Sequence, residues 1–277
     1  MMEELIQKIT AGHVPNLSIA FMIFTLVMIL VIFIGLPIFL KLKYKCSFVD
    51  FVAGCGVWFL FAGVIEALFH SIILASPVGA VIQGNIVLMA LYGGFMAGLF
   101  EETGRFLVMK FLFKKTMDNN MNAIMYGAGH GGFEAFMILF FTMLNNLIYS
   151  LMINSGSFGV AAEAFKILPN EQAITTLEGI ASLCTASSSL FLIGLIERII
   201  AIIGHISMSI FVWYSVKEKK PSYFLIAFAF HFILDAGSVL VNSVSPNMYV
   251  TEICIGLFTA AFSVWAARLI RQKKELS

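Results

Sequence analysis

The stretch SIAFMIFTLVMILVIFIGLPIFL, residues 18–40, contains no charged side chain. It is long enough to cross the hydrocarbon core of a bilayer as an α-helix, which takes about 20 apolar residues. Further apolar runs of similar length follow at residues 48–74, 80–113, 121–154, 183–216, 222–243 and 248–270. None shows the alternation of a barrel strand, and only helices and closed barrels satisfy their backbone hydrogen bonds in lipid. The sequence therefore predicts an all-α, polytopic membrane protein with about seven transmembrane helices, forming a single integral membrane domain over residues 1–277.

The composition points the same way. Of the 277 residues, 60% are hydrophobic and 12% are charged, about half the charged fraction of roughly 25% that is usual in soluble proteins. The net charge of +1 is too small to indicate a nucleic-acid partner, so the bilayer itself is the expected surrounding. Glu3 and Glu4 precede the first run and lysines follow it, so we interpret it as an uncleaved anchor and not as a signal peptide.

Positive charges gather at one set of helix ends. They follow the first, third, fifth and seventh runs, as Lys41, Lys43, Lys45, Lys114, Lys115, Lys217, Lys219, Lys220, Arg268, Arg271, Lys273 and Lys274. The opposite side carries only Lys8 and Lys166. Because lysine and arginine mark cytoplasmic loops, the N-terminus is predicted outside and the C-terminus in the cytoplasm. The outer segment 155–182 is expected to include an amphipathic helix at the interface over 158–168, and the serines at 187–189 are a point where the fifth run could break.

Ionisable side chains inside the predicted helices are costly, at least about 2.5–3.5 kcal/mol each at the bilayer centre. They are Glu66, His70, Glu101, Glu102, Arg105, Lys110, His130, Glu134, Glu197, Arg198, His205, His231 and Asp235. Four of them, on four different helices, lie roughly 12 to 20 Å from the cytoplasmic helix ends: Glu101, His130, His205 and His231. We predict that these four converge on one cavity in the cytoplasmic half of the membrane. Glu66 and His70 lie near the other end of their helix and are expected to form a structural pair outside this cavity.

Three pairs of these residues are spaced i, i+4, so each pair shares one helix face. The pairs are Glu101 with Arg105, His130 with Glu134, and His231 with Asp235. Arg105 is expected to hold Glu101 ionised, and a carboxylate at i+4 can fix the tautomer of an imidazole.

The residue types at these positions favour water activation. The GxSxG and HExxH motifs and a second mid-helix aspartate, needed for serine, zincin and aspartyl mechanisms, are absent from the helices. Glu101 would take a proton from water with the help of His130, and His231 with Asp235 would hold the developing oxyanion. A divalent metal such as zinc is a variant on the same residues, with Glu101, His130, His205 and His231 as candidate ligands.

Short motifs in this order resemble those of a known superfamily. Residues 100–105 (FEETGR), Tyr126 with His130, and residues 231–235 (HFILD) are similar to the EExxxR, aromatic-xxx-His and HxxxN/D motifs of the CAAX-prenyl-protease and PrsW superfamily of intramembrane proteases. The run Glu197-Arg198 followed by His205 resembles the bacterial YhfC-like branch. The resemblance covers a catalytic core at about residues 95–240. Arg105 is one residue closer than in the CAAX pattern, Asp235 replaces the commoner Asn, and Glu134 is additional.

The resemblance implies an intramembrane peptidase of the bacterial cell membrane. Its substrate would be a membrane-embedded or lipidated peptide or protein. Glu101 would be the general base and His130 its partner, while His231 and Asp235 would position the carbonyl oxygen. Glu102 and Arg105 would complete the catalytic set, and the supporting residues would be Glu134, Glu197, Arg198 and His205.

Other classes of protein also bury ionisable groups in membrane helices. A proton-coupled or cation-coupled transporter needs them, although it would be expected to show broken helices in two related halves, and only Gly93-Gly94 interrupts a run here. A non-catalytic membrane scaffold, with the ionisable residues as structural locks between helices, is the third reading. Cleavage of a peptide by the purified protein would separate the three.

Overall fold

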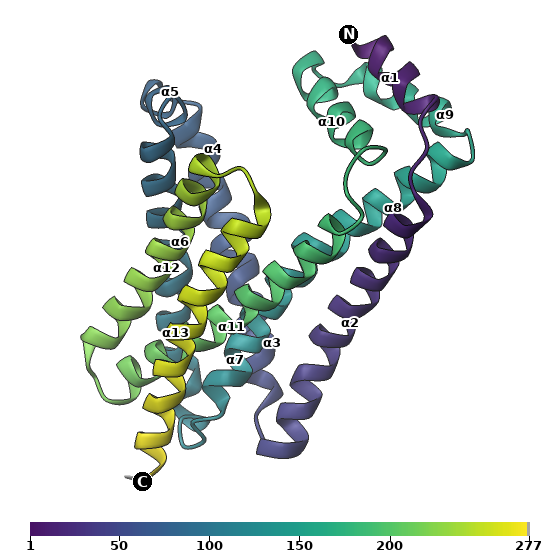
Figure 1. Cartoon of the computed structure of the whole chain (residues 1–277). Coiled ribbons are helices and arrows are strands. Elements are labelled where there is room, and N and C mark those ends of the chain that lie inside the picture. The colour runs from purple at the N-terminus through teal and green to yellow at the C-terminus, as the bar shows by residue number, and fades with distance from the viewer. Residues whose placement is uncertain (276–277) are drawn as a thin grey trace. The chain divides into compact units, whose positions relative to one another are not determined.

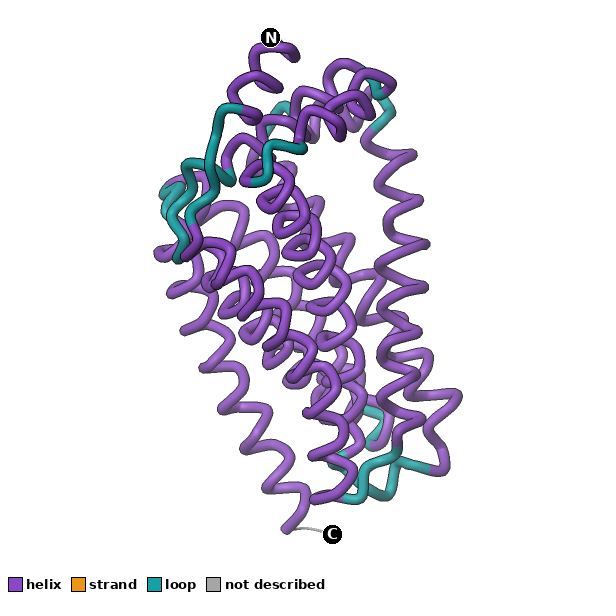
Figure 2. Tube along the Cα trace, turned by 90° about the vertical axis from the view of Figure 1, so that its right-hand side faces the viewer, coloured by secondary structure: helices purple, strands orange, loops and turns teal. Residues whose placement is uncertain are grey.

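The computed structural model describes residues 1–275, apart from the side chains of Lys166, Lys274 and Glu275, two of which belong to the charge pattern above. Every regular element among the described residues is helical, as Figure 2 shows, which confirms the predicted all-α class. The α-helices are α1 Met2–Thr10, α2 Asn16–Tyr44, α3 Phe48–Val57, α4 Ala67–Leu74, α5 Pro77–Gln83, α6 Ile86–Leu112, α7 Asn122–Ala135, α8 Phe141–Asn154, α9 Phe158–Ala162, α10 Asn170–Ser182, α11 Leu190–Lys217, α12 Pro221–Val244 and α13 Met248–Glu275. Two π-helical turns, Trp58–Glu66 and Phe136–Phe140, join α3 to α4 and α7 to α8, and two 3₁₀ turns cover Phe113–Lys115 and Glu163–Ile167.

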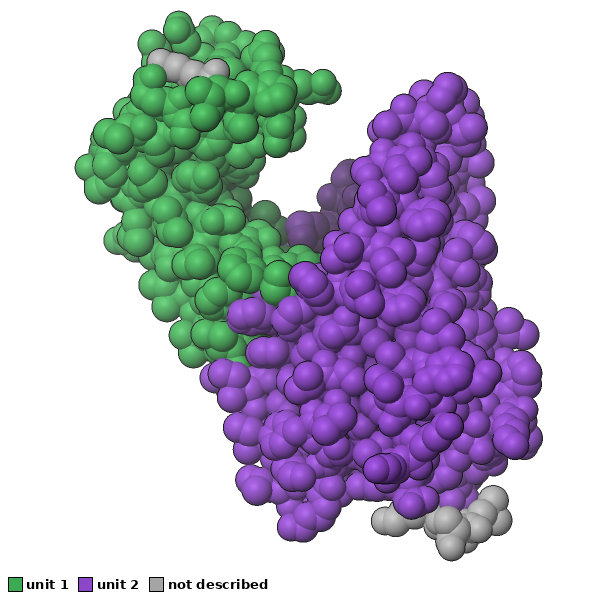
Figure 3. All heavy atoms as spheres, turned by 180° about the vertical axis from the view of Figure 1, so that it is seen from behind, with its two compact units in different colours: residues 1–30, 137–195 green, residues 31–136, 196–277 purple. Residues whose placement is uncertain are grey.

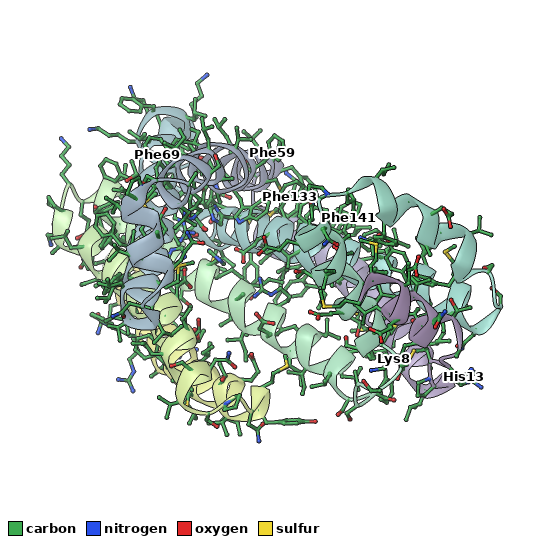
Figure 4. All side chains as sticks on the ribbon, turned by 90° about the horizontal axis from the view of Figure 1, so that it is seen from above. Lys8, His13, Phe59, Phe69, Phe133 and Phe141 are labelled. Atoms are coloured by element: carbon green, nitrogen blue, oxygen red, sulfur yellow. The ribbon has the colours of Figure 1, made fainter. Side chains whose placement is uncertain are left out.

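Seven continuous helical stretches are long and apolar enough to cross a membrane, which confirms the predicted number. They are Asn16–Tyr44, Phe48–Leu74, Ile86–Lys115, Asn122–Asn154, Leu190–Lys217, Pro221–Val244 and Met248–Lys273. Their order along the chain can be followed in Figure 1. Large apolar side chains remain exposed along these stretches, among them Phe59 and Phe69, with 53% and 45% of their surface exposed (Figure 4). Such exposure is what a helix surrounded by lipid requires.

Helix boundaries differ from the sequence prediction at two places, and capping explains the first. The predicted run 80–113 is divided into α5 and α6, because Asn85 begins a new helix by accepting hydrogen bonds from the backbone N–H groups of Val87 and Leu88. A side-chain oxygen at this position satisfies donors that have no partner within the helix. The third membrane-spanning stretch therefore begins at residue 86.

The second difference concerns the region before the fifth stretch. Its helix begins at Leu190, directly after the serines at 187–189, where the sequence allowed a break. The segment predicted as one helix over 158–168 is a short α-helix followed by a 3₁₀ turn, which ends before Pro169. Proline disfavours helical backbone in the residue before it, which accounts for the stop.

The chain divides into two compact units, coloured separately in Figure 3. Unit 1 comprises residues 1–30 and 137–195. In this unit the Asn154 side chain bonds both the N–H and the C=O of Val14, and Thr25 donates to the Phe191 carbonyl. Lys8 and His13 are exposed at its surface (Figure 4).

Unit 2 comprises residues 31–136 and 196–277. Within it α6 packs along α12 and α3 packs along α7, and glycines let these helix backbones come close. A Cβ at Gly94 would lie 2.5 Å from the Phe232 carbonyl oxygen, and one at Gly54 would lie 2.3 Å from that of Tyr126. Small residues at such crossings are the usual means by which membrane helices approach each other. Every ionisable residue of the predicted site lies in this unit.

Candidate active site

The predicted site residues surround one small cavity in unit 2. The residues come from α6 (Glu101, Glu102, Arg105), α7 (His130, Glu134), α11 (Glu197, Arg198, His205) and α12 (His231, Asp235). The cavity has a volume of about 130 Å³, and seven of the ten residues line it: Glu101, Glu134, Glu197, Arg198, His205, His231 and Asp235. A cavity of this size with polar walls has room for water. His130, Glu102 and Arg105 lie behind this lining and have no exposed surface.

Glu101 is the centre of the cluster. Its Oε2 lies 2.8 Å from His130 Nε2 and 3.9 Å from His205 Nδ1. The two imidazole rings have centroids 4.9 Å apart. The three side chains are buried, with 7%, 0% and 5% of their residue surface exposed for Glu101, His130 and His205. Three helices therefore place a carboxylate and two imidazoles in contact within the interior of unit 2.

Two glycines on α7 permit this approach of α7 to α11. A Cβ at Gly131 would lie 2.8 Å from the Cβ of His205, and one at Gly127 would lie 2.5 Å from the Cα of Ile206. Because the two glycines are four residues apart, they share one helix face. His205 thus reaches the cluster through a gap that larger side chains on α7 would fill.

The contacts of His205 fix its tautomer. Arg105 Nη2 lies 3.0 Å from His205 Nδ1, and a guanidinium can only donate, so Nδ1 accepts. The proton of the neutral imidazole is then on Nε2, which lies 2.7 Å from Glu134 Oε2. A carboxylate that faces the far nitrogen of an imidazole is the usual arrangement around histidines that bind metals.

His231 is held outside the Glu101 cluster. Its Nδ1 lies 2.9 Å from Glu102 Oε1, and its Nε2 lies 3.5 Å from Asp235 Oδ2. Glu102 is fully buried and is also paired with Arg105, whose Nη1 is 3.3 Å from Oε1. A carboxylate only accepts, so Nδ1 donates, and His231 is oriented by Glu102 with its other nitrogen toward Asp235.

Two of the three predicted i, i+4 pairings are wrong. Arg105 pairs with Glu102 and not with Glu101, whose carboxylate turns to His130 on another helix. His130 does not pair with Glu134, and its Nδ1 has no hydrogen-bond partner. Glu101 and His130 instead pair with each other across α6 and α7, and Arg105 turns to Glu102 on its own helix. The His231–Asp235 pair is present at 3.5 Å.

Glu134 belongs to a second group of charges on the cavity wall. Arg198 Nη1 lies 2.9 Å from Glu134 Oε1, and Arg198 Nη2 contacts Glu197 Oε1. The exposed fractions of the Glu134 and Arg198 side chains are 13% and 15%. This ion-pair group braces α7 against α11 beside His205.

Glu66 and His70 pair with each other away from the cavity lining. His70 Nε2 lies 3.1 Å from Glu66 Oε1, and His70 Nδ1 lies 2.8 Å from the Tyr92 hydroxyl. One further polar residue lines the cavity, Ser238, which was not among the predicted site residues. The spacing His231, Asp235, Ser238 continues the same face of α12 and could have indicated it.

A divalent metal fits the residues that are present. Glu101, His130 and His205 each offer one ligand atom, and these atoms all lie within 4.8 Å of one another. Two imidazoles and one carboxylate are a usual zinc ligand set for catalysis. Of the four predicted candidates, His231 is the one left out of this group, since its Nδ1 is engaged by Glu102.

Comparison with known proteins adds independent findings. A family profile described as YhfC intramembrane metalloprotease matches residues 26–255 of the chain. The chain is also similar to a protein of Bacillus subtilis (strain 168) named "Uncharacterized membrane protein YhfC", with 31% identity over 243 residues, which cover 86% of this chain and 91% of the relative. No solved structure matches.

Proposed function

We propose that this chain, which belongs to the family of YhfC intramembrane metalloproteases, hydrolyses peptide bonds at the cavity in unit 2. Its substrates would be membrane-embedded or lipidated peptides or proteins. The observation that carries the proposal is the buried contact of Glu101, His130 and His205 beside a polar cavity. Bracing between helices would not need three imidazoles and five carboxylates around one space, because apolar packing would avoid their desolvation cost.

We propose that Glu101, His130 and His205 hold the metal ion. When bound there, a divalent ion such as zinc would acidify water and polarise a carbonyl group. Glu134 orients His205 from the side of Nε2, at 2.7 Å. Arg105, at 3.0 Å from Nδ1, would have to give up this contact for Nδ1 to become a ligand, and it retains Glu102 as its ion-pair partner.

The proton of the attacking water needs a carboxylate that is not itself a ligand. Glu102 is fully buried and engaged by Arg105, and Glu134 is engaged by Arg198. Asp235 lines the cavity and has 39% of its side chain exposed, so we assign it as the proton acceptor. His231 donates from Nδ1 to Glu102, so in its doubly protonated form it would also donate from Nε2, beside Asp235 Oδ2, to the carbonyl oxygen as negative charge develops. In a metal-free mechanism the base would instead be Glu101, with His130 as its partner.

The orientation in the membrane is part of the proposal. Lysines and arginines at the ends of four stretches favour a cytoplasmic C-terminus and an outer N-terminus in a bacterial cell membrane. Reporter fusions after Lys45, Lys115 and Lys220 should all report the cytoplasm. An external signal from any one of them would exclude this topology.

The activity can be tested without knowledge of the natural substrate. The purified protein is reconstituted in liposomes with a library of membrane-protein peptides, and new peptide termini are identified by mass spectrometry. Termini that appear with the wild-type protein and are lost in Glu101→Gln support the hydrolase. If the same termini appeared with both proteins, a contaminating protease would be the source. If no termini appeared with either protein while the liposomes showed protein-dependent proton or cation flux, the result would favour a transporter.

A further inference from the structure

A second cavity lies in unit 2 where α6 and α11 end and α12 begins. It is an open groove of about 700 Å³, far larger than the cavity at Glu101. Its walls combine aromatic rings with ammonium groups: Phe106, Phe111, Phe224, Lys110, Lys114 and Lys219. None of the described residues that line it is acidic. An apolar groove with only positive charges attracts an anion that carries apolar chains.

The three lysines of the groove differ from others nearby in having no carboxylate partner among the described side chains. Lys220 and Lys273 both pair with Glu218, at 3.1 Å and 2.6 Å. Burial acts to raise the pKa of Glu218, but the hydrogen bonds from these lysines outweigh it and lower the pKa. Glu218, which directly precedes Lys219 in the chain, is therefore ionised and already paired with two other lysines, and no carboxylate among the described side chains pairs with Lys110, Lys114 or Lys219.

The groove also contains a buried hydroxyl group without a hydrogen-bond partner. Ser215 lines it with 3% of its surface exposed, and its Oγ has no hydrogen-bond partner. Burying a hydroxyl without a partner is unfavourable, so a ligand oxygen that Oγ reaches by rotation about χ1 would satisfy it. The ammonium of Lys110 lies 5.4 Å and 5.5 Å from the ring centroids of Phe106 and Phe111, which places its aliphatic stem along the apolar wall.

We propose that this groove binds an anionic phospholipid. The headgroup phosphate lies between Lys110, Lys114 and Lys219 and accepts a hydrogen bond from Ser215, while an acyl chain follows Phe106, Phe111 and Phe224. Basic pockets between helix ends at a membrane surface suit anionic headgroups. The aromatic walls favour a lipid over free phosphate, because inorganic phosphate has no apolar surface to bury. The proposal does not depend on the catalytic activity.

The test uses the full-length protein in neutral detergent, titrated with dioleoylphosphatidylglycerol and followed by native mass spectrometry. The variant Lys110→Gln/Lys114→Gln/Lys219→Gln removes the groove charges. Its matched control is Lys41→Gln/Lys43→Gln/Lys45→Gln, which removes three lysines around the end of α2. Each triple includes one lysine with a positive φ angle, Lys219 at 55° and Lys45 at 58°, so the backbone cost is comparable.

The groove variant should bind phosphatidylglycerol at least about tenfold more weakly than the wild type, since each lysine near an anionic lipid surface contributes several-fold. The control should bind as the wild type does. Ser215→Ala should weaken binding by about threefold and leave the thermal midpoint of the free protein unchanged, because its hydroxyl has no partner to lose. Equal affinities of the two triples, or equal binding of dioleoylphosphatidylcholine and phosphatidylglycerol by the wild type, would overturn the proposal. Competition by millimolar inorganic phosphate as strong as that by the lipid would also overturn it, in favour of a free anion.

Discussion

Two pairs of glutamate and histidine lie inside the membrane helices of unit 2, and they are built differently. Glu66 and His70 are one turn apart on the same helical stretch, with Nε2 and Oε1 separated by 3.1 Å, and Tyr92 completes the contacts of the imidazole. Glu101 and His130 come from different helices at 2.8 Å, and His205 from a third joins them. In the first pair both imidazole nitrogens have hydrogen-bond partners. The second pair belongs to a network of ionisable side chains that lines a cavity.

This difference indicates which buried ionisable side chains act in catalysis or metal binding. Both nitrogens of His70 have partners and neither residue of its pair lines the cavity, so this pair needs no ligand. His130 keeps one nitrogen without a partner, and its other nitrogen shares Glu101 with His205. Perturbed and crowded ionisable groups at a cavity are the usual sign of a functional site. We therefore predict that the same substitution at Glu66 and at Glu101, which are equally buried, has very unequal effects on activity.

The largest effect is expected from Glu101→Gln. The amide keeps the shape of the side chain but cannot serve as a metal ligand or a base of the same strength, so the rate of peptide cleavage should fall by about 10²–10⁴. The amount of folded protein should stay the same, since a neutral amide is less costly to bury than a carboxylate. Initial rates at matched protein concentration measure the effect. Undiminished cleavage would remove Glu101 from the mechanism.

Glu134→Gln should have the next largest effect. Loss of a carboxylate that orients a metal-binding histidine typically costs about 10–100-fold in metal affinity. The variant should therefore need a higher zinc concentration for half-maximal activity and approach the wild-type rate at saturation. Asp235→Asn serves as its counterpart, because it should lower the rate while zinc affinity is unchanged. If both variants changed zinc affinity to the same extent, the assignment of Asp235 as proton acceptor would be wrong.

A packing variant tests whether His205 needs its place beside α7. Gly131→Ala brings a methyl group to 2.8 Å from the Cβ of His205, and such overpacking typically costs about 1–3 kcal/mol. Thermal unfolding in detergent should show this loss, together with lower activity. Gly93→Ala is the matched control, because a Cβ there meets nothing within 4 Å. A stable and fully active Gly131→Ala protein would show that α7 and α11 do not constrain the site.

Glu66→Gln should have the smallest effect. It weakens one hydrogen bond to His70, worth about 0.5–1.5 kcal/mol in the free energy of unfolding, and leaves the cavity lining intact. Cleavage rates should equal those of the wild type. A loss of activity as large as that of Glu101→Gln would mean that the two pairs belong to one functional network.

The fold was predictable from sequence because its signal is local. Uninterrupted apolar runs identified the seven stretches, and only details such as the start of α6 directly after its capping residue Asn85 depended on local hydrogen bonds. The residues around the site were also predictable, since an ionisable group in an apolar run stands out against its surroundings. Their partners were not. The sequence favoured Arg105 with Glu101, but the structure pairs it with Glu102 on the same helix, because the Glu101 carboxylate faces His130 on another helix, and the sequence does not show which side chain of another helix a carboxylate faces.

The zinc content of the protein tests the proposed metal site most directly. Metal-stripped protein in detergent is incubated with zinc, desalted and measured by inductively coupled plasma mass spectrometry, with circular dichroism to confirm retained helix. The wild type should hold about one zinc ion per chain, and Glu101→Gln/His130→Ala/His205→Ala should hold none. Glu66→Gln/His70→Ala, the same residue types in the self-contained pair, should match the wild type. Equal zinc in all three proteins, or none in the wild type, would contradict the assignment of Glu101, His130 and His205 as a metal centre.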